Sequence, residues 1–395
     1  MKKNYYLFLI LIFAFLLYGN TIPNKYALDD LYVTSDNPQI VKGVSGIPEI
    51  FTTFYTELND VKFAYRPIVK VSYAIEYEFF GKNPHASHLI NVLLYALGGG
   101  LLFLLLSRKM FFRQDNLFSF LVVILFMAHP VHTEVVASLK NRDELLSFIF
   151  SISATYLAFV FIDRKKILFL MLAAFLIFIA YLSKPSALVF VALIPLCLYF
   201  FRNIRIKELV IVFIAIFVFA IVARYLPKWI LDNGNRGYYF IENPLVEGVG
   251  LLKTLGTGMT SLWFYFKMLF LPYPLLFYYG YDTIPIVSLF NPIAIFSLLL
   301  HLTLLIIAIL NLKKKSIISF SILFYFISIS MFSNIVKPAM GIVAERYMFT
   351  AILGFAIVLV FLSFKFSEKY WKHKFKYLKF KPLIIILFFV VPFSV

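Results

Sequence analysis

Two adjacent carboxylates, Asp29 and Asp30, follow the first apolar segment of this chain by only a few residues. That segment is just long enough to cross a bilayer, which places the pair near the far interface. A carboxylate costs roughly 2.5 to 3.5 kcal/mol at the bilayer centre, so ionisable groups beside a span are candidates for function. One carboxylate is suited to act as a general base on a hydroxyl group. The alternative is that one of them caps a short helix.

Further polar clusters recur beside the apolar segments, and the topology derived below places all of them on the same side of the membrane. They are Tyr65-Arg66-Pro67, His85 and His88 with Asn91, His129-Pro130-Val131-His132-Thr133-Glu134, Asn141-Arg142-Asp143-Glu144, Ser183-Lys184-Pro185, Glu242-Asn243-Pro244 and Ala344-Glu345-Arg346-Tyr347.

The spacing of His129, His132 and Glu134 allows two readings. Histidines one helical turn apart with a nearby carboxylate are able to hold a divalent metal. Pro130 interrupts a helix between the two histidines, and no thiolate is near. We therefore favour a polar network for substrate over a metal site, and we expect no required metal or other cofactor.

The composition places these clusters in a membrane protein. Hydrophobic residues make up 62% of the 395 residues and charged residues 14%, with a mean hydropathy of +0.88. A soluble chain carries about 25% charged residues. The single cysteine, Cys197, excludes an intramolecular disulfide and a thiolate metal cluster. The basic start before the first apolar segment resembles a secretory signal without a cleavage site, so we expect a retained anchor.

The net charge of +17 follows topology rather than nucleic-acid binding. Basic residues concentrate in the short loops on one side of the membrane. In the loops on the other side, basic and acidic residues balance. This is the bias of cytoplasmic loops, and it orients the chain with Met1 inside. The basic segments are Lys2-Lys3, Arg108-Lys109-Arg113, Arg164-Lys165-Lys166, Arg202-Arg205-Lys207, 313–315 and 365–381.

The apolar runs predict an all-α polytopic protein with about 10 to 12 transmembrane helices. The segment 251–271 breaks the alternation of sides, so we expect an interfacial or re-entrant element there. The last run, 383–395, is short for a span, and its abrupt end suggests a truncated C-terminus. The predicted spans are 5–21, 86–106, 117–136, 145–162, 166–182, 186–201, 208–226, 287–310, 317–333 and 347–364.

We expect one membrane-embedded domain over 1–395. Its first outer loop, 22–85, contains the aspartate pair and a surface helix over 66–80, whose apolar face carries Ile68, Val71, Ile75 and Phe79. A second outer loop spans 227–286 and includes the segment 251–271.

The order of these clusters resembles the membrane domain of the transmembrane and tetratricopeptide-repeat O-mannosyltransferases. The resemblance runs from about Tyr26 to Gly354, and the block from His129 to Glu134 is its most specific part. The family's Gly-Arg-Ala-Asp block is replaced here by the residues 141–144, and the family's repeats are absent. The resemblance implies the architecture of a C-type membrane glycosyltransferase.

The resemblance also implies the reaction. A polyprenyl-phosphate sugar, most simply mannose, would enter from the bilayer, and a protein serine or threonine hydroxyl from the aqueous side. Asp29 or Asp30 would accept the hydroxyl proton during a single displacement that inverts the anomeric carbon. Arg66, Lys184 and Arg346 are the cations suited to the departing phosphate, with surface anchoring or ion pairing as the alternative.

The remaining candidates divide into two groups. Those expected to bind donor phosphate or sugar are Arg66, His129, His132, Glu134, Arg142, Asp143, Lys184, Glu345 and Arg346. Those expected to support the site are Tyr65, His88, Asn91, Glu242 and Asn243.

Two other functions fit the sequence. One is glycosyl transfer to a lipid or a cell-wall polymer. The other is a transporter or lipid flippase, but transporters typically show repeat symmetry and mid-span ionisable groups, whereas the charges here gather at one interface. We expect a protein of the bacterial inner membrane with its site on the periplasmic side. The alternative is a protein of the endoplasmic reticulum membrane with a luminal site. Its expected partners are a lipid-linked sugar and an acceptor protein, and no nucleic acid.

Overall fold

The computed structural model describes residues 2–58, 61–231, 237, 239–276, 279 and 282–371. Within these ranges the chain is helical apart from one two-stranded hairpin. It divides into two compact units. The first comprises Met1–Asn116 and Thr133–Arg236, and the second comprises Leu117–His132 and Gly237–Val395. The single membrane-embedded domain expected over 1–395 stays a prediction.

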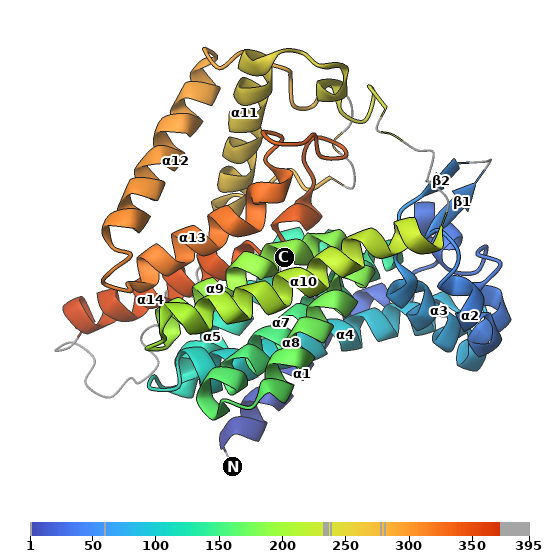
Figure 1. Cartoon of the computed structure of the whole chain (residues 1–395), viewed down its shortest axis with the longest axis horizontal. Coiled ribbons are helices and arrows are strands. Elements are labelled where there is room, and N and C mark those ends of the chain that lie inside the picture. The colour runs from blue at the N-terminus through green and yellow to red at the C-terminus, as the bar shows by residue number, and fades with distance from the viewer. Residues whose placement is uncertain are drawn as a thin grey trace. The chain divides into compact units, whose positions relative to one another are not determined.

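The first unit is a bundle in which α7 packs against α4 and α8, while α1 packs on α4 and α10 packs on α8 and α9 (Figure 1). Fully buried Ala173, Ala174 and Ala180 let α8 approach its neighbours closely. The elements are α1 (Lys2–Tyr18), η1 (Gly19–Thr21), α4 (Pro84–Leu105), η4 (Leu106–Met110), α6 (Thr133–Ala137), η6 (Leu139–Asn141), α7 (Arg142–Arg164), α8 (Ile167–Ser183), η7 (Pro185–Val189), α9 (Phe190–Phe201) and α10 (Ile206–Ile230).

The first outer loop folds into short elements with an apolar core of their own. Val33, Ile40, Tyr55, Val69 and Tyr73 are buried there together with Leu146 of α7. The elements are η2 (Leu28–Val33), η3 (Ile40–Gly46), α2 (Ile47–Ile50), α3 (Pro67–Phe80) and the antiparallel strands β1 (Thr56–Leu58) and β2 (Val61–Phe63).

The predicted surface helix over 66–80 is confirmed as α3, which begins at Pro67. Proline suits this first position because it has no amide hydrogen, and amides in the first turn of a helix have no partner within the helix. Two residues of its predicted apolar face are exposed, Ile75 at 43% and Phe79 at 74%, whereas Ile68 and Val71 are half-buried. Its polar residues Lys70 and Glu76 are instead buried. The exposed Ile75 and Phe79 suit a lipid surface, and the placement of α3 on the membrane stays a prediction.

In the second unit, α11 packs on α12, α12 on α13 and α13 on α14. A Cβ atom on Gly354 of α14 would lie 2.8 Å from the Ser321 carbonyl oxygen of α13, so this contact needs glycine. The elements are α5 (Asn116–Ala128, of which Asn116 belongs to the first unit), η5 (Pro130–His132), η8 (Pro244–Glu247), α11 (Leu251–Phe270), α12 (Pro292–Leu310), α13 (Ile317–Ile329), η9 (Ser330–Phe332), η10 (Glu345–Met348) and α14 (Ile352–Trp371).

Each of the ten predicted spans overlaps a helix, but the span 117–136 is bent by 61° after α5 and the span 287–310 is helical only from Pro292. Among the described residues, five helical segments are long and apolar enough to cross a membrane, or six if α5 and the helical turns after it form one broken span. Three further apolar helices are shorter, namely Ile167–Ser183, Pro185–Phe201 and Ile317–Phe332. The chain is therefore a multi-pass membrane protein. The five segments are Asn4–Thr21, Pro84–Met110, Leu139–Arg164, Ile206–Ile230 and Pro292–Leu310.

Two predicted segments need separate mention. The segment 251–271 forms the continuous helix α11, which is not among the helices apolar enough to cross a membrane. Its interfacial or re-entrant character stays a prediction. The run 383–395 and part of the basic stretch 365–381 lie outside the described residues.

Candidate functional site

Asp30 is the buried member of the aspartate pair. Its carboxylate is held in the first unit by two backbone amides, Lys140 N–H to Oδ1 at 3.0 Å and Ala27 N–H to Oδ2 at 3.1 Å. Burial raises the pKa of Asp30 above its ordinary value, and these two hydrogen bonds oppose that rise. The bond to Ala27 closes the start of η2, so the capping alternative is confirmed for Asp30.

Asp29 is the accessible member of the pair. Its side chain is 48% exposed, and its carboxylate forms an ion pair with the Lys140 ammonium. Lys140 thus contacts Asp29 through its side chain and Asp30 through its backbone. Because one residue fixes both carboxylates, the aspartates are tied to the segment immediately before α7.

Two carboxylates in the first turn of α7, Asp143 and Glu144, bind two of the predicted phosphate cations. Lys184 Nζ lies 3.1 Å from Asp143 Oδ1 and 2.9 Å from Glu144 Oε1. Arg66 donates to the other oxygen of Asp143. Carboxylates at a helix start interact favourably with the helix dipole. The four side chains bring together two positive and two negative charges at the start of α7.

Arg66 is the more accessible cation of these four side chains. Its side chain is 22% exposed, against 9% for Lys184, and its guanidinium lies 5.0 Å from the centre of the Tyr55 ring. Arg66 lies in the outer loop directly before α3, and Lys184 lies directly before η7.

Arg142, a predicted donor ligand, is fully buried with its polar groups engaged. It forms an ion pair with Glu76 at 2.7 Å and donates from Nε to Asn91 Oδ1 at 2.8 Å. A further bond runs from Nη2 to the Ser87 carbonyl at 3.0 Å, and the guanidinium stacks on Tyr73 at 3.9 Å. These contacts favour a structural role, in which Arg142 ties α7 to α3 and α4.

The other predicted residues of the first unit surround this region. Tyr65 donates from its hydroxyl to the Phe51 carbonyl at 2.8 Å. His88 is buried on α4, one turn before Asn91. Glu134 is buried on α6, and its carbonyl oxygen accepts a bond from the Asn141 amide at 3.0 Å. These contacts are consistent with residues that hold the site in place. They do not test whether Glu134 binds the donor.

His129 and His132 are fully buried in the second unit. His129 Nε2 lies 3.2 Å from the Leu269 carbonyl oxygen. The His132 ring packs between Phe126 and Phe349, at 4.5 and 4.4 Å between ring centres. These aromatic surroundings do not fit a metal site, and no group of three or more metal-ligating side chains gathers in the described part of the chain.

The predicted Glu345 also lies in the second unit. Its carboxylate is buried and accepts hydrogen bonds from Leu276 N–H at 2.6 Å and from the Tyr279 hydroxyl at 2.9 Å. Arg346 is partly buried, and its guanidinium lies 5.0 Å from the centre of the Tyr347 ring. Arg346 therefore lies in η10, the short helix before α14. Its contact with a phosphate stays a prediction.

Asn243 belongs to a buried amide pair that organises this segment. It donates to Asn334 Oδ1 at 3.0 Å and to the Ala339 carbonyl at 2.7 Å. Asn334 in turn donates to the Ile342 carbonyl at 2.7 Å. The carbonyl oxygen of Glu242 accepts a bond from Gly341 N–H at 3.1 Å. The predicted Glu242 and Asn243 thus hold the loop that leads to Glu345.

Four residues of these networks were absent from the predicted site. Glu144 belongs to the polar cluster 141–144, and Lys140 directly precedes that cluster. Their proximity to predicted residues in the sequence was the available signal. Glu76 lies on the helix predicted over 66–80, at a polar position among apolar ones. Asn334 had no distinguishing sequence signal, because its role depends on contacts with a segment 91 residues away.

Comparison with known proteins confirms the resemblance, although no family model matches the chain. A Caenorhabditis elegans protein O-mannosyl-transferase, F38B6.6, is 24% identical over 376 residues, which cover 91% of this chain and 51% of the relative. Human protein O-mannosyl-transferase TMTC1 is 28% identical over 136 residues, which cover 33% of this chain and 15% of the relative. The chain therefore spans about half or less of these curated relatives.

The fold is also similar to a solved structure, the archaeal oligosaccharyltransferase AglB from Archaeoglobus fulgidus. That structure contains an inhibitory peptide and a dolichol-phosphate. The TM-score is 0.54 at 12% identity, and the match covers all of this chain and 55% of AglB. The expected all-helical C-type glycosyltransferase fold is confirmed.

Proposed function

We propose that this protein is a membrane glycosyltransferase that transfers mannose from a polyprenyl-phosphate carrier to a serine or threonine hydroxyl of a protein. The sequence similarity to protein O-mannosyl-transferases over most of the chain supports the sugar and the acceptor. The fold shared with an oligosaccharyltransferase supports a lipid-linked donor. The positive-inside bias supports a site on the outer side, in the periplasm of a bacterium.

Asp29 is the proposed base. The acceptor hydroxyl oxygen forms a bond to the anomeric carbon while the bond from that carbon to the phosphate oxygen breaks. The hydroxyl proton moves to the Asp29 carboxylate, and the polyprenyl phosphate leaves with the bonding electron pair. A single displacement of this kind inverts the anomeric carbon. Exposure favours Asp29 over Asp30, whose two oxygens already accept backbone hydrogen bonds.

Arg66 and Lys184 are the proposed phosphate ligands. Asp143 and Glu144 hold both cations in place before the donor binds, which avoids the cost of ordering two long side chains during binding. A phosphate oxygen is then able to share the guanidinium and ammonium donors with these carboxylates. Arg346 is a third proposed cation, and we assign it no place relative to the first unit.

One observation carries the proposal. An exposed carboxylate, Asp29, is tied through Lys140 to the segment that also supplies Asp143 and Glu144 to Arg66 and Lys184. A base and two phosphate-binding cations are thereby linked to one helix start. The reaction needs both kinds of group, because a proton must be accepted at the nucleophile and negative charge stabilised at the leaving group.

The decisive test is transfer from defined polyprenyl-phosphate mannose to an acceptor peptide by purified protein. Asp29→Asn is expected to slow transfer by about 10² to 10⁴-fold, the usual contribution of a general base. Asp36→Asn is the matched control, because Asp36 is an exposed outer-loop aspartate whose only near cation is Lys82 at 3.8 Å among the described ion pairs. Full activity in a folded Asp29→Asn variant would remove the base assignment.

Substrate identity is tested in the same system. Donors that carry other sugars, and acceptors that are lipids or cell-wall polymers, are expected to react more slowly than mannose donors with peptide. Faster transfer to a lipid or polymer would replace the protein acceptor. Movement of lipid-linked sugar across vesicles by protein that transfers no sugar would replace the enzyme with a flippase.

A further inference from the structure

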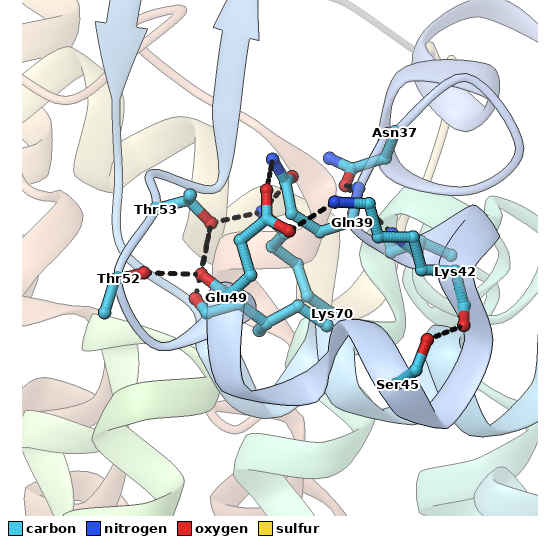
Figure 2. A network of polar contacts seen from close by, with 10 residues as sticks. Asn37, Gln39, Lys42, Ser45, Glu49, Thr52, Thr53 and Lys70 are labelled. Atoms are coloured by element: carbon cyan, nitrogen blue, oxygen red, sulfur yellow. Dashed lines mark hydrogen bonds and ion pairs between the residues drawn. The ribbon is translucent and has the colours of Figure 1, made fainter.

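A lysine on the outer-loop helix α3 is buried without a direct ion pair among the described residues. Lys70 is 1% exposed, and its ammonium donates to Gln39 Oε1 at 2.9 Å, Thr53 Oγ1 at 3.0 Å and the Phe54 carbonyl at 3.0 Å (Figure 2). An ammonium has three donors, so all of them are used. The bonds fasten the residues before η3 and the turn after α2 to α3.

Charged groups surround these neutral acceptors. On α2, Glu49 accepts from the Gln39 amide at 3.3 Å and pairs with Lys42 of η3 at 2.5 Å (Figure 2). On β1, Glu57 acts on Lys70 electrostatically. Burial lowers the pKa of Lys70 to about 8, and Glu57 and Glu49 oppose that shift.

The turn that Lys70 holds leads directly to the candidate site. Phe54 precedes Tyr55, whose amide donates to the Ala64 carbonyl at 2.9 Å and whose ring contacts the Arg66 guanidinium. Arg66 lies one helical turn before Lys70, and Lys70 N–H donates to the Arg66 carbonyl at 3.4 Å. The side chain of Lys70 therefore contacts the residues just before Tyr55, and its backbone amide contacts Arg66. Both partners of the contact between Tyr55 and Arg66 are attached to Lys70 in this way.

We propose that Lys70 is a positioning residue, which holds the 53–55 segment on α3 so that Tyr55 keeps Arg66 in contact with Asp143. The catalytic consequence rests on the proposed function, whereas the structural consequence does not. Arg66 has a flexible side chain that is partly exposed, so the Tyr55 ring restricts the positions it can occupy. Without the three bonds from Lys70, the turn loses these polar connections to α3, while the Tyr55 ring still packs with Val69 and Tyr73.

The same contacts predict a response to alkali. A neutral amine donates only two hydrogens, so one of the three bonds is lost when Lys70 releases its proton. Loss of one hydrogen bond is expected to loosen the 53–55 segment by about a factor of five, from roughly 1 kcal/mol per bond. The change should occur around pH 8 and should leave the segment folded through its two remaining bonds.

The structural arm of the test is hydrogen exchange of the Tyr55 amide in the full-length protein. Lys70→Met is expected to reduce its protection by at least about tenfold. Lys42→Met is the matched control, because it removes an exposed lysine of the same network, and it should leave Tyr55 unchanged. Lys70→Gln, which keeps donors without charge, should fall between them. Unchanged protection of Tyr55 in both Lys70 variants would overturn the proposal.

Two further readouts complete the test. In the unsubstituted protein, Tyr55 protection corrected for intrinsic exchange should fall between pH 7 and pH 9, and a flat profile would overturn the proposal even if neither variant folds. In the mannosyl-transfer assay, Lys70→Met should raise the KM for the lipid donor with little change in kcat. If the exchange results hold but the unsubstituted protein transfers no sugar, the proposed function fails while the positioning of Arg66 stands.

Discussion

The backbone amide of Lys140 donates to Asp30 Oδ1 at 3.0 Å, although the two residues lie 110 positions apart. This bond joins η2 of the outer loop to the segment before α7. Because the bond uses the main chain, it survives any substitution of the Lys140 side chain except proline. The Lys140 ammonium is therefore free to be tested as a partner of Asp29 alone.

Lys140→Met is expected to lower mannosyl transfer while leaving the fold intact. The lost ion pair is about half exposed, so its removal should change the free energy of unfolding by less than about 1 kcal/mol. Asp29 loses the group that orients it, so transfer should fall more than stability does. Thermal unfolding and initial rates measure both effects. Lys82→Met removes another exposed outer-loop ion pair and serves as control, and equal activity of the two variants would contradict a role for Lys140.

Asp30 predicts a specific dependence of stability on pH. Burial raises the pKa of Asp30 in the folded protein above the ordinary value of 3.8. Between these two pKa values the folded state binds more protons than the unfolded state, so the free energy of unfolding falls as pH rises through that window. Asp30→Asn should remove this contribution, whereas Asp36→Asn should retain it. Melting temperatures measured at several acidic pH values would show an unchanged slope in Asp30→Asn if the assignment is wrong.

Arg142→Met is expected to destabilise the first unit by about 3 to 5 kcal/mol, because it leaves Glu76 buried without its cation. The unfolding midpoint of the purified protein measures this loss. Arg113→Met removes an exposed arginine and should have little effect. The double variant Arg142→Met with Glu76→Gln should recover part of the loss, and strictly additive effects would contradict the coupling of the two residues.

Asn334→Ala is expected to destabilise the second unit by about 2 to 3 kcal/mol, since it leaves buried partners such as the Ile342 carbonyl unpaired. Transfer should also fall, because the loop leading to Glu345 loses its buried anchor. Asn311→Ala removes a surface amide bond at the end of α12 and provides the control. Equal melting temperatures for the two variants would refute this role.

Chelation of divalent metals is expected to leave transfer unchanged. The ring of His132 is packed between two phenylalanines, and His129 contacts a backbone carbonyl, so neither environment resembles a metal site. The measurement compares rates before and after dialysis against EDTA. Loss of activity that manganese or magnesium restores would establish a metal requirement and contradict this prediction.

The sequence predicts the helices well, because apolar runs of span length report directly on the solvent that surrounds them. All ten predicted spans overlap helices, and α3 lies where its spacing places it. The polar clusters beside the spans also identified most of the residues that form the networks at the start of α7. In these cases the signal is local, since composition and spacing within one segment decide the structure.

The partners of those residues depended on tertiary structure. Arg66 and Lys184 are expected to bind the departing phosphate, and both contact carboxylates that the fold brings to them from α7. Arg142 is expected to bind donor, and the structure shows its guanidinium paired with Glu76 of α3. A charged side chain shows in the sequence only its type and approximate depth. Its counter-ion is set by which helices pack together, so pairing across tens of residues has no local signature.

The same distinction separates Asp29 from Asp30. The sequence determines that two carboxylates stand beside a membrane span, because the apolar length before them fixes their depth. Only the tertiary structure decides that one is exposed and the other buried under two backbone amides. The physical reason is that burial and hydrogen bonding arise from the segment before α7, which folds against the pair from more than a hundred residues away.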